Sequence, residues 1–107
     1  MEDDTTTFHA NEYSWNNFAN VLYIESPGGV GFSTCADATD CTFDDDTSAA
    51  DNLVALLYFF EKLFTEFQAN KLYISGESYA GIYVPYVANQ IDIYNAKAAT
   101  GDFKFNL

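Results

Sequence analysis

One short segment of this sequence has the residue types and the spacing of a serine nucleophile. Residues 76–81 read G-E-S-Y-A-G and fit the pattern G-x-S-x-G, with Ser78 at the centre. A serine hydroxyl is a poor nucleophile at neutral pH unless a sharp turn exposes it and a base stands beside it. Small flanking residues permit such a turn, because a Cβ there would crowd the neighbouring backbone. The segment therefore predicts nucleophilic catalysis through Ser78.

The residues on either side predict the strand and the helix that such a turn connects. Residues 71–75 are rich in apolar side chains and suit a strand that ends just before the turn. Downstream, apolar side chains recur at helical spacing, and the predicted helix runs to about Ala96. Pro85 lies inside this helix, so we expect a kink there or a regular helix that begins near this residue.

A second strand and a second helix are predicted upstream. Residues 21–24 form a short apolar run of β-formers, typical of a strand buried on both faces of a parallel sheet. Leucines and phenylalanines recur at three- and four-residue steps over residues 53–67 and predict the apolar face of a helix. Ser48 and Asp51 fit a capping box at its start, and Asn70 fits a left-handed stop.

The order of these elements predicts the fold class. Residues 103–107 alternate like a further strand, which completes the order β-α-β-α-β. This order predicts an α/β fold, with parallel strands joined by right-handed crossover helices. We expect one domain over residues 1–107, in which residues 1–14 are an irregular lead-in.

The charge balance argues against two classes of partner. Sixteen acidic residues against four basic ones give a net charge of −12, which disfavours nucleic acid and anionic membranes.

The longest apolar run, residues 53–60, is too short to span a bilayer. The acidic N-terminus has no apolar segment of the kind that a signal peptide needs.

Two cysteines flank a short acidic segment. Cys35 and Cys41 would form a local disulfide in an exported protein, and a pair of free thiols is the alternative. A metal site would need more ligands nearby, and His9 is the only histidine of the chain. We therefore expect neither a metal nor a cofactor.

Two blocks of sequence resemble serine carboxypeptidases, peptidase family S10. One covers residues 15–33, and the other, residues 72–85, is similar to the nucleophile block of that family almost residue for residue. The form G-E-S-Y-A-G is much more specific than a bare G-x-S-x-G. The similarity runs from about Tyr13 to residue 107 and implies a partial α/β-hydrolase fold around the nucleophile turn.

The resemblance also implies roles for three consecutive residues. Ser78 would attack the last peptide carbonyl and so release C-terminal residues from peptides with a free C-terminus. The backbone N–H of Tyr79 would donate to the oxyanion. Glu77 would be half of a glutamate pair that binds the terminal carboxylate of the substrate, which requires one of the pair to hold a proton. Such an enzyme favours acidic pH, and the resemblance implies a lysosomal, vacuolar or secreted location.

Several parts of the family pattern are absent from these 107 residues. They are the N-G-G-P-G oxyanion segment, the second glutamate, and the triad aspartate and histidine that follow the serine in this fold. His9 precedes Ser78, an order known from a β-barrel fold, so we expect a solvent-exposed tail histidine and no activity of the chain alone. The strand between the two predicted ones would also be missing, and unpaired sheet edges would favour self-association.

Two alternatives remain open. Another α/β-hydrolase, an esterase or lipase, would use the same serine, but a neutral ester needs no acid at Glu77. A non-catalytic module that binds peptides or a partner protein is favoured by the missing histidine and aspartate.

Overall fold

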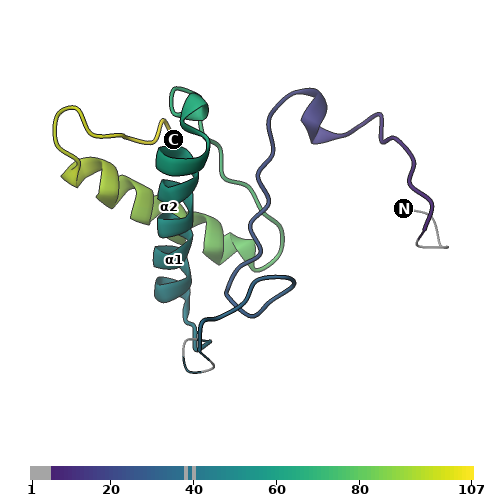
Figure 1. Cartoon of the computed structure of the whole chain (residues 1–107), viewed down its shortest axis with the longest axis horizontal. Coiled ribbons are helices and arrows are strands. Elements are labelled where there is room, and N and C mark those ends of the chain that lie inside the picture. Colours follow the sequence, from purple (N-terminus) through teal and green to yellow (C-terminus); the bar gives the residue numbers. More distant parts are fainter. Residues whose placement is uncertain (1–5, 38, 40) are drawn as a thin grey trace.

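Two helices dominate the computed structural model, which describes residues 6–37, 39 and 41–107. Helix α1 spans Asp45–Tyr58 and helix α2 spans Ala80–Lys97, so both helices predicted from periodicity are confirmed. Figure 1 shows α2 running across α1, while the chain before α1 extends away from the helix pair. Three shorter helical turns accompany them: the 3₁₀ turns η1 (Trp15–Asn17) and η4 (Thr65–Phe67), and the π-helical turn η3 (Phe59–Leu63).

Helix α1 begins earlier than predicted, because Asp44 caps it. The Asp44 carboxylate accepts the backbone N–H of Thr47 at 2.7 Å, and the Thr47 hydroxyl accepts the N–H of Asp44 at 3.0 Å. These reciprocal bonds satisfy two N–H groups that the helix leaves without a partner. The predicted capping box at Ser48 and Asp51 is therefore wrong, and Ser48 is instead buried within the first turns of α1.

The cap should make folding sensitive to acid. Hydrogen bonds from Thr47 lower the pKa of the Asp44 carboxyl, so its stabilising effect is present at neutral pH and is lost as pH falls through that lowered pKa. We expect Asp44→Ala to lower the melting temperature at pH 7 by roughly 4–8 °C. Thermal melts followed by circular dichroism measure this. Asp44→Asn is the control, since asparagine keeps the cap and does not titrate. Equal melting of wild type and Asp44→Ala would contradict the role of the cap.

The first helix widens at its end instead of running regularly to Phe67. The N–H of Phe64 donates to the carbonyl of Phe59, five residues earlier, at 2.8 Å. This π-type turn brings the two rings together, with centroids 4.7 Å apart, while Phe60 stays in the core. The side chain of Gln68 closes the segment by donating to the carbonyl of Phe60 at 2.9 Å. The apolar spacing correctly predicted that Leu56 and Phe60 are buried, but Leu63 and Phe64 of the same stripe are 55% and 41% exposed after the π-type turn.

The core lies where the two helices cross. Ile91 of α2 is fully buried at its centre, and the C-terminal segment adds Phe105. Asn95 holds that segment by accepting the N–H of Phe105 and donating to its carbonyl, both at 2.9 Å. The buried apolar residues are Ala49, Leu56, Phe60, Val87, Ile91 and Phe105.

This core is small for the length of the chain. The radius of gyration is 16.1 Å, whereas a compact domain of this size has about 13 Å. Large apolar side chains remain in solvent, for example Phe32 at 95% and Tyr73 at 80% exposure. Within the described part of the chain, neither helix is long and apolar enough to cross a membrane.

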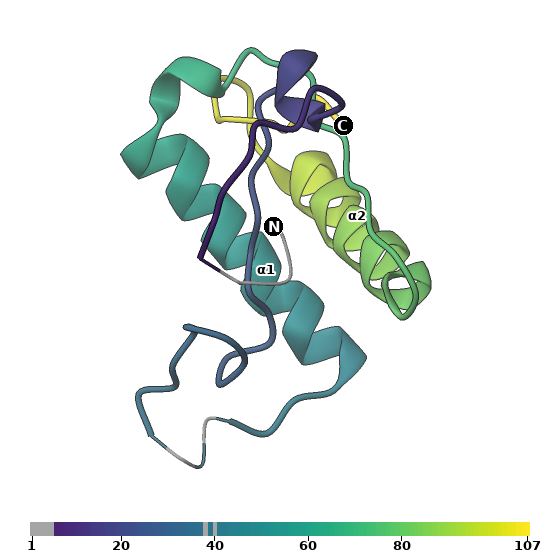
Figure 2. The same ribbon diagram turned by 90° about the vertical axis from the view of Figure 1, so that its right-hand side faces the viewer.

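The predicted sheet is absent, so the α/β prediction is wrong for this chain. Among residues 6–37, 39 and 41–107 there is no strand, and the only β-type pairing is a parallel bridge between Lys71 and Asn106. Residues 21–24 and 72–75 are extended without pairing to each other, and Figure 2 shows the chain before α1 apart from the segment that leads into α2. Extended backbone becomes a strand only where another segment satisfies its N–H and C=O groups. Residue types predict extended backbone, but they do not supply the partner.

Candidate active site

Ser78 occupies the turn that leads into α2. Its φ is 60°, and among the described residues it is the only non-glycine residue with a positive φ. The turn is held by two backbone hydrogen bonds, from the N–H of Ala80 to the carbonyl of Glu77 at 3.1 Å and from the N–H of Gly81 to the carbonyl of Ser78 at 3.0 Å. An L-residue adopts this left-handed conformation at a cost, and such strain gathers at functional sites. The turn leaves Ser78 exposed to solvent, as a nucleophile requires.

The two glycines that flank the turn differ in their surroundings. A Cβ at Gly76 would overlap the Cβ of Ala80, so the segment before the turn approaches α2 too closely for any side chain. A Cβ at Gly81 would meet nothing within 4 Å. In this chain the close approach of the backbone therefore requires glycine at position 76 but not at position 81.

Tyr79 connects the turn to the start of α1. Its hydroxyl donates to the Asp45 carboxylate, with distances of 3.2 and 3.3 Å to the two oxygens. The hydrogen bond and the negative charge of Asp45 raise the pKa of Tyr79, so its hydroxyl keeps the proton that it donates. The ring of Tyr83 lies edge-on, with centroids 4.9 Å apart. The backbone N–H of Tyr79 makes none of the hydrogen bonds found in the described turn, and so can still donate to an oxyanion.

A cavity of about 330 Å³ opens beside Tyr79, between the start of α1 and the start of α2. Polar and aromatic groups dominate its walls. The residues that line it are Pro27, Phe43, Asp44, Asp45, Ser48, Tyr79 and Tyr83. The contact of Asp45 with Tyr79 was not predicted from the sequence. The two residues lie 34 positions apart, and no local pattern relates them.

Glu77 and His9 are not brought into a catalytic arrangement with Ser78. Glu77 is exposed on the turn, and its side chain makes no hydrogen bond within the described residues. His9 is exposed in the segment before η1. The hydroxyl of Ser78 makes no hydrogen bond to His9 or to any other described side chain. Over the described ranges, no group of three or more histidine, cysteine, aspartate or glutamate side chains could hold a metal ion.

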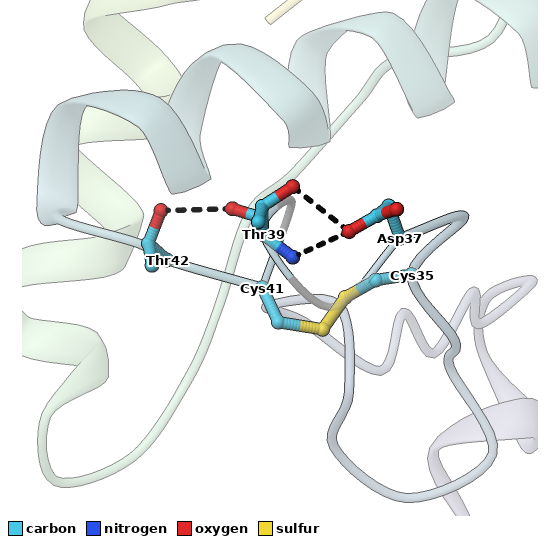
Figure 3. Close-up of a disulfide and its surroundings, with 5 residues drawn as sticks. All are labelled: Cys35, Asp37, Thr39, Cys41 and Thr42. Atoms are coloured by element: carbon cyan, nitrogen blue, oxygen red, sulfur yellow. Dashed lines mark hydrogen bonds between the residues drawn. A yellow bond between two sulfur atoms is a disulfide. The ribbon is translucent and has the colours of Figure 1, made fainter.

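Cys35 and Cys41 form a disulfide in the segment before α1. Cys35 and Cys41 are joined with Cα atoms 5.9 Å apart, and Figure 3 shows the bond beside the hydrogen bonds from Thr39 to the Asp37 carboxylate. Those bonds, the backbone N–H of Thr39 first, lower the pKa of Asp37. A Cβ at Gly28 would lie 3.2 Å from the sulfur of Cys35. The disulfide therefore packs against the turn that follows residues 21–24.

A family model and the curated relatives of this chain agree on one protein family. A family model described as serine carboxypeptidase matches residues 1–107. Serine carboxypeptidase-like 21 from Arabidopsis thaliana is 52% identical over 83 residues, which cover 78% of this chain and 17% of that protein. Lysosomal protective protein from Mus musculus is 50% identical over 88 residues, which are 82% of this chain and 18% of that protein.

A third relative covers nearly the whole chain. Serine carboxypeptidase ctsa-4.1 from Caenorhabditis elegans is 42% identical over 104 residues, 97% of this chain and 21% of that protein. No solved structure matches the chain. The chain spans about a fifth of the length of the curated relatives it matches. The family match over all 107 residues, together with the G-E-S-Y-A-G turn at Ser78, shows that this chain belongs to the serine carboxypeptidase family, a family of peptidases.

Proposed function

We propose that this chain carries the nucleophile of a serine-type carboxypeptidase, and that Ser78 is that nucleophile. The observation that carries the proposal is the conformation of Ser78, a non-glycine residue with φ of 60° at the exposed turn into α2. The strain of this turn has no evident use in packing, because Ser78 is not part of the core. It does present a hydroxyl at the start of a helix, as acyl transfer requires.

In the proposed reaction, the oxygen of Ser78 attacks the carbonyl carbon of the last peptide bond. The negative charge that develops on the carbonyl oxygen is stabilised by the N–H of Tyr79. The C–N bond then breaks, the C-terminal amino acid leaves with a proton, and an acyl-serine ester remains. Water attacks this ester, releases the shortened peptide and restores the serine hydroxyl. Glu77, one residue away, would face the terminal carboxylate of the substrate.

The isolated 107-residue chain is proposed to be inactive. No described side chain is hydrogen-bonded to the Ser78 hydroxyl and able to take its proton. A base contributes about 10²–10⁴-fold to such reactions, and the serine alone attacks slowly. The substrates would be peptides with a free C-terminus. The location would be lysosomal, vacuolar or secreted, in keeping with the name of the mouse relative.

A chimera supplies the missing base and tests the proposal. The 104-residue stretch of the C. elegans serine carboxypeptidase that matches this chain is replaced by the residues of this chain. The chimera is given a blocked dipeptide with a free C-terminus and the same peptide as a C-terminal amide. We expect hydrolysis of the free acid to be faster by at least about tenfold at acid pH, since Glu77 then faces a carboxylate. The unmodified host enzyme controls for assay conditions. Equal rates on the two peptides would rule out a carboxypeptidase and favour an esterase-type hydrolase.

A further inference from the structure

The backbone hydrogen bonds of the nucleophile turn are all local. The N–H of Ala80 donates to the carbonyl of Glu77 at 3.1 Å, three residues earlier. The N–H of Gly81 donates in the same way to the carbonyl of Ser78 at 3.0 Å. Ser78 keeps a φ of 60°, which costs free energy for an L-residue and persists only where the surroundings impose it. The turn therefore depends on contacts beyond its own backbone.

Tyr79 is the residue of this turn whose side chain bonds to a distant segment. Among the described residues, the side chains of Glu77 and Ser78 make no hydrogen bond. The Tyr79 hydroxyl donates to the Asp45 carboxylate, whose two oxygens lie 3.2 and 3.3 Å away. Because 34 positions of sequence separate Tyr79 from Asp45, this bond joins the turn to a separate element, the first residue of α1.

The acceptor end of this bond is well fixed. Asp45 is half-buried in the first turn of α1. The preceding residue, Asp44, caps the helix through reciprocal hydrogen bonds with Thr47. The helix itself packs against α2 over the buried core. Asp45 therefore offers an anchor that does not move with the turn.

The ring of Tyr79 is held from a second side. Tyr83, one helical turn further along α2, lies edge-on to it, with ring centroids 4.9 Å apart and an interplanar angle of 64°. Aromatic pairs favour this arrangement. The N–H of Tyr79, the proposed oxyanion donor, belongs to the same peptide unit as the carbonyl of Ser78. Contacts that fix the Tyr79 side chain therefore restrain the peptide unit that must face the substrate.

We propose that Tyr79, anchored on Asp45 through its hydroxyl, is a positioning residue that holds Ser78 and the oxyanion donor in their reactive geometry. The side-chain hydroxyl acts through the backbone and touches no reacting atom. Its effect on hydrolysis rests on the proposed function. Its effect on the turn does not, because the turn forms without any reaction.

The first test is the steady-state kinetics of Tyr79→Phe in the chimera, on the blocked dipeptide with a free C-terminus. Phenylalanine keeps the ring that meets Tyr83 and removes the hydroxyl. We expect kcat to fall about tenfold while KM stays within about twofold, because a displaced nucleophile affects the chemical step. The effect is modest because Tyr79 is 53% exposed and water can compete for the bond.

Variants of the anchor make this test specific. Asp45→Ala should lower kcat as Tyr79→Phe does, and the double variant should fall no further, because both changes remove one bond. Asp45→Asn should recover most of the loss, since its amide oxygen still accepts from Tyr79. Asp46→Ala is the matched control. It removes an exposed carboxylate from the same turn of α1, and that carboxylate does not bond to Tyr79.

The second test uses the 107-residue chain and needs no catalysis. Amide hydrogen exchange at Ala80 and Gly81, followed by NMR, reports opening of the turn, since these N–H groups close it. We expect Tyr79→Phe and Asp45→Ala to speed this exchange about fivefold, as the loss of one exposed hydrogen bond would. Asp46→Ala should leave the exchange unchanged.

The two tests separate this inference from the proposed function. Unchanged exchange in Tyr79→Phe would overturn the positioning role, whatever the chimera does. A higher KM with unchanged kcat would also contradict it, since Tyr79 would then act in substrate binding. If the chimera with Tyr79 and Asp45 intact failed to hydrolyse peptides, the proposed function would be wrong. The exchange measurement would still decide whether the Tyr79–Asp45 bond holds the turn.

Discussion

Replacing Ser78 by alanine in the chimera should reduce peptide hydrolysis by at least about 10⁴-fold. The substitution removes the oxygen that forms the acyl-enzyme, so the reaction loses its covalent path. Alanine adds no bulk, and the Ser78 side chain makes no hydrogen bond within the described structure that folding would miss. The loss should therefore fall on kcat, while KM stays close to that of the unmodified chimera.

Ser75→Ala is the matched control for this experiment. Ser75 is an exposed serine three residues earlier, outside the turn at residues 76–81. Its substitution should leave kcat and KM within about twofold, since surface changes away from special features have small effects. Steady-state kinetics on the blocked dipeptide measure both variants. If Ser78→Ala retained more than about a hundredth of the activity, Ser78 would not be the nucleophile.

Gly76→Ala should destabilise the turn, and with it the placement of Ser78. The added Cβ would overlap the Cβ of Ala80, and it would also meet Val84 Cγ2 at 3.4 Å. Either the segment before the turn or the start of α2 must move. We expect a loss of about 1–3 kcal/mol in the free energy of unfolding of the 107-residue chain. In the chimera we expect a fall of about 10²-fold in kcat/KM, because misplacement of a nucleophile by 1 Å costs about that much.

Gly81→Ala separates this steric effect from a general effect of losing glycine. Nothing lies within 4 Å of a Cβ at position 81, which is inside α2, so alanine should be neutral or slightly stabilising there. Urea unfolding of both variants measures the difference. Adding Ala80→Gly to Gly76→Ala should recover part of the loss, because it removes the second of the overlapping atoms. Equal stability of Gly76→Ala and Gly81→Ala would contradict the close approach.

The spacing of apolar residues predicted the helices well, because helix formation depends mainly on residues close together in the sequence. The spacing of leucines and phenylalanines predicted α1 and the burial of Leu56 and Phe60, and the apolar spacing after Ser78 predicted α2. Helix α2 begins at Ala80 and contains Pro85, so the regular helix does not begin near that proline. The predictions were wrong where contacts with other residues set the local structure. The cap moved to Asp44 because Thr47 completes a capping box with it, and the end of α1 widened because Phe59 and Phe64 pack together.

The sheet shows the limit of such reasoning most clearly. Residues 21–24 and 72–75 have the composition of buried strands, yet neither is a strand among the described residues. A strand needs hydrogen bonds from a second segment, and residue types cannot supply them. Asn95 holds Phe105 and thereby brings Asn106 alongside Lys71, where the N–H of Leu72 donates to the carbonyl of Asn106 at 2.8 Å.

By itself, the sequence determined the chemistry proposed for this protein. The residues G-E-S-Y-A-G identify the proposed nucleophile and, with the block before them, the family, because both depend on residue identity along a short stretch of chain. Only the tertiary structure decided what surrounds that serine. The Tyr79–Asp45 hydrogen bond forms where the start of α1 meets the start of α2. Packing determines contacts between residues more than thirty positions apart, and no periodicity in the sequence predicts them.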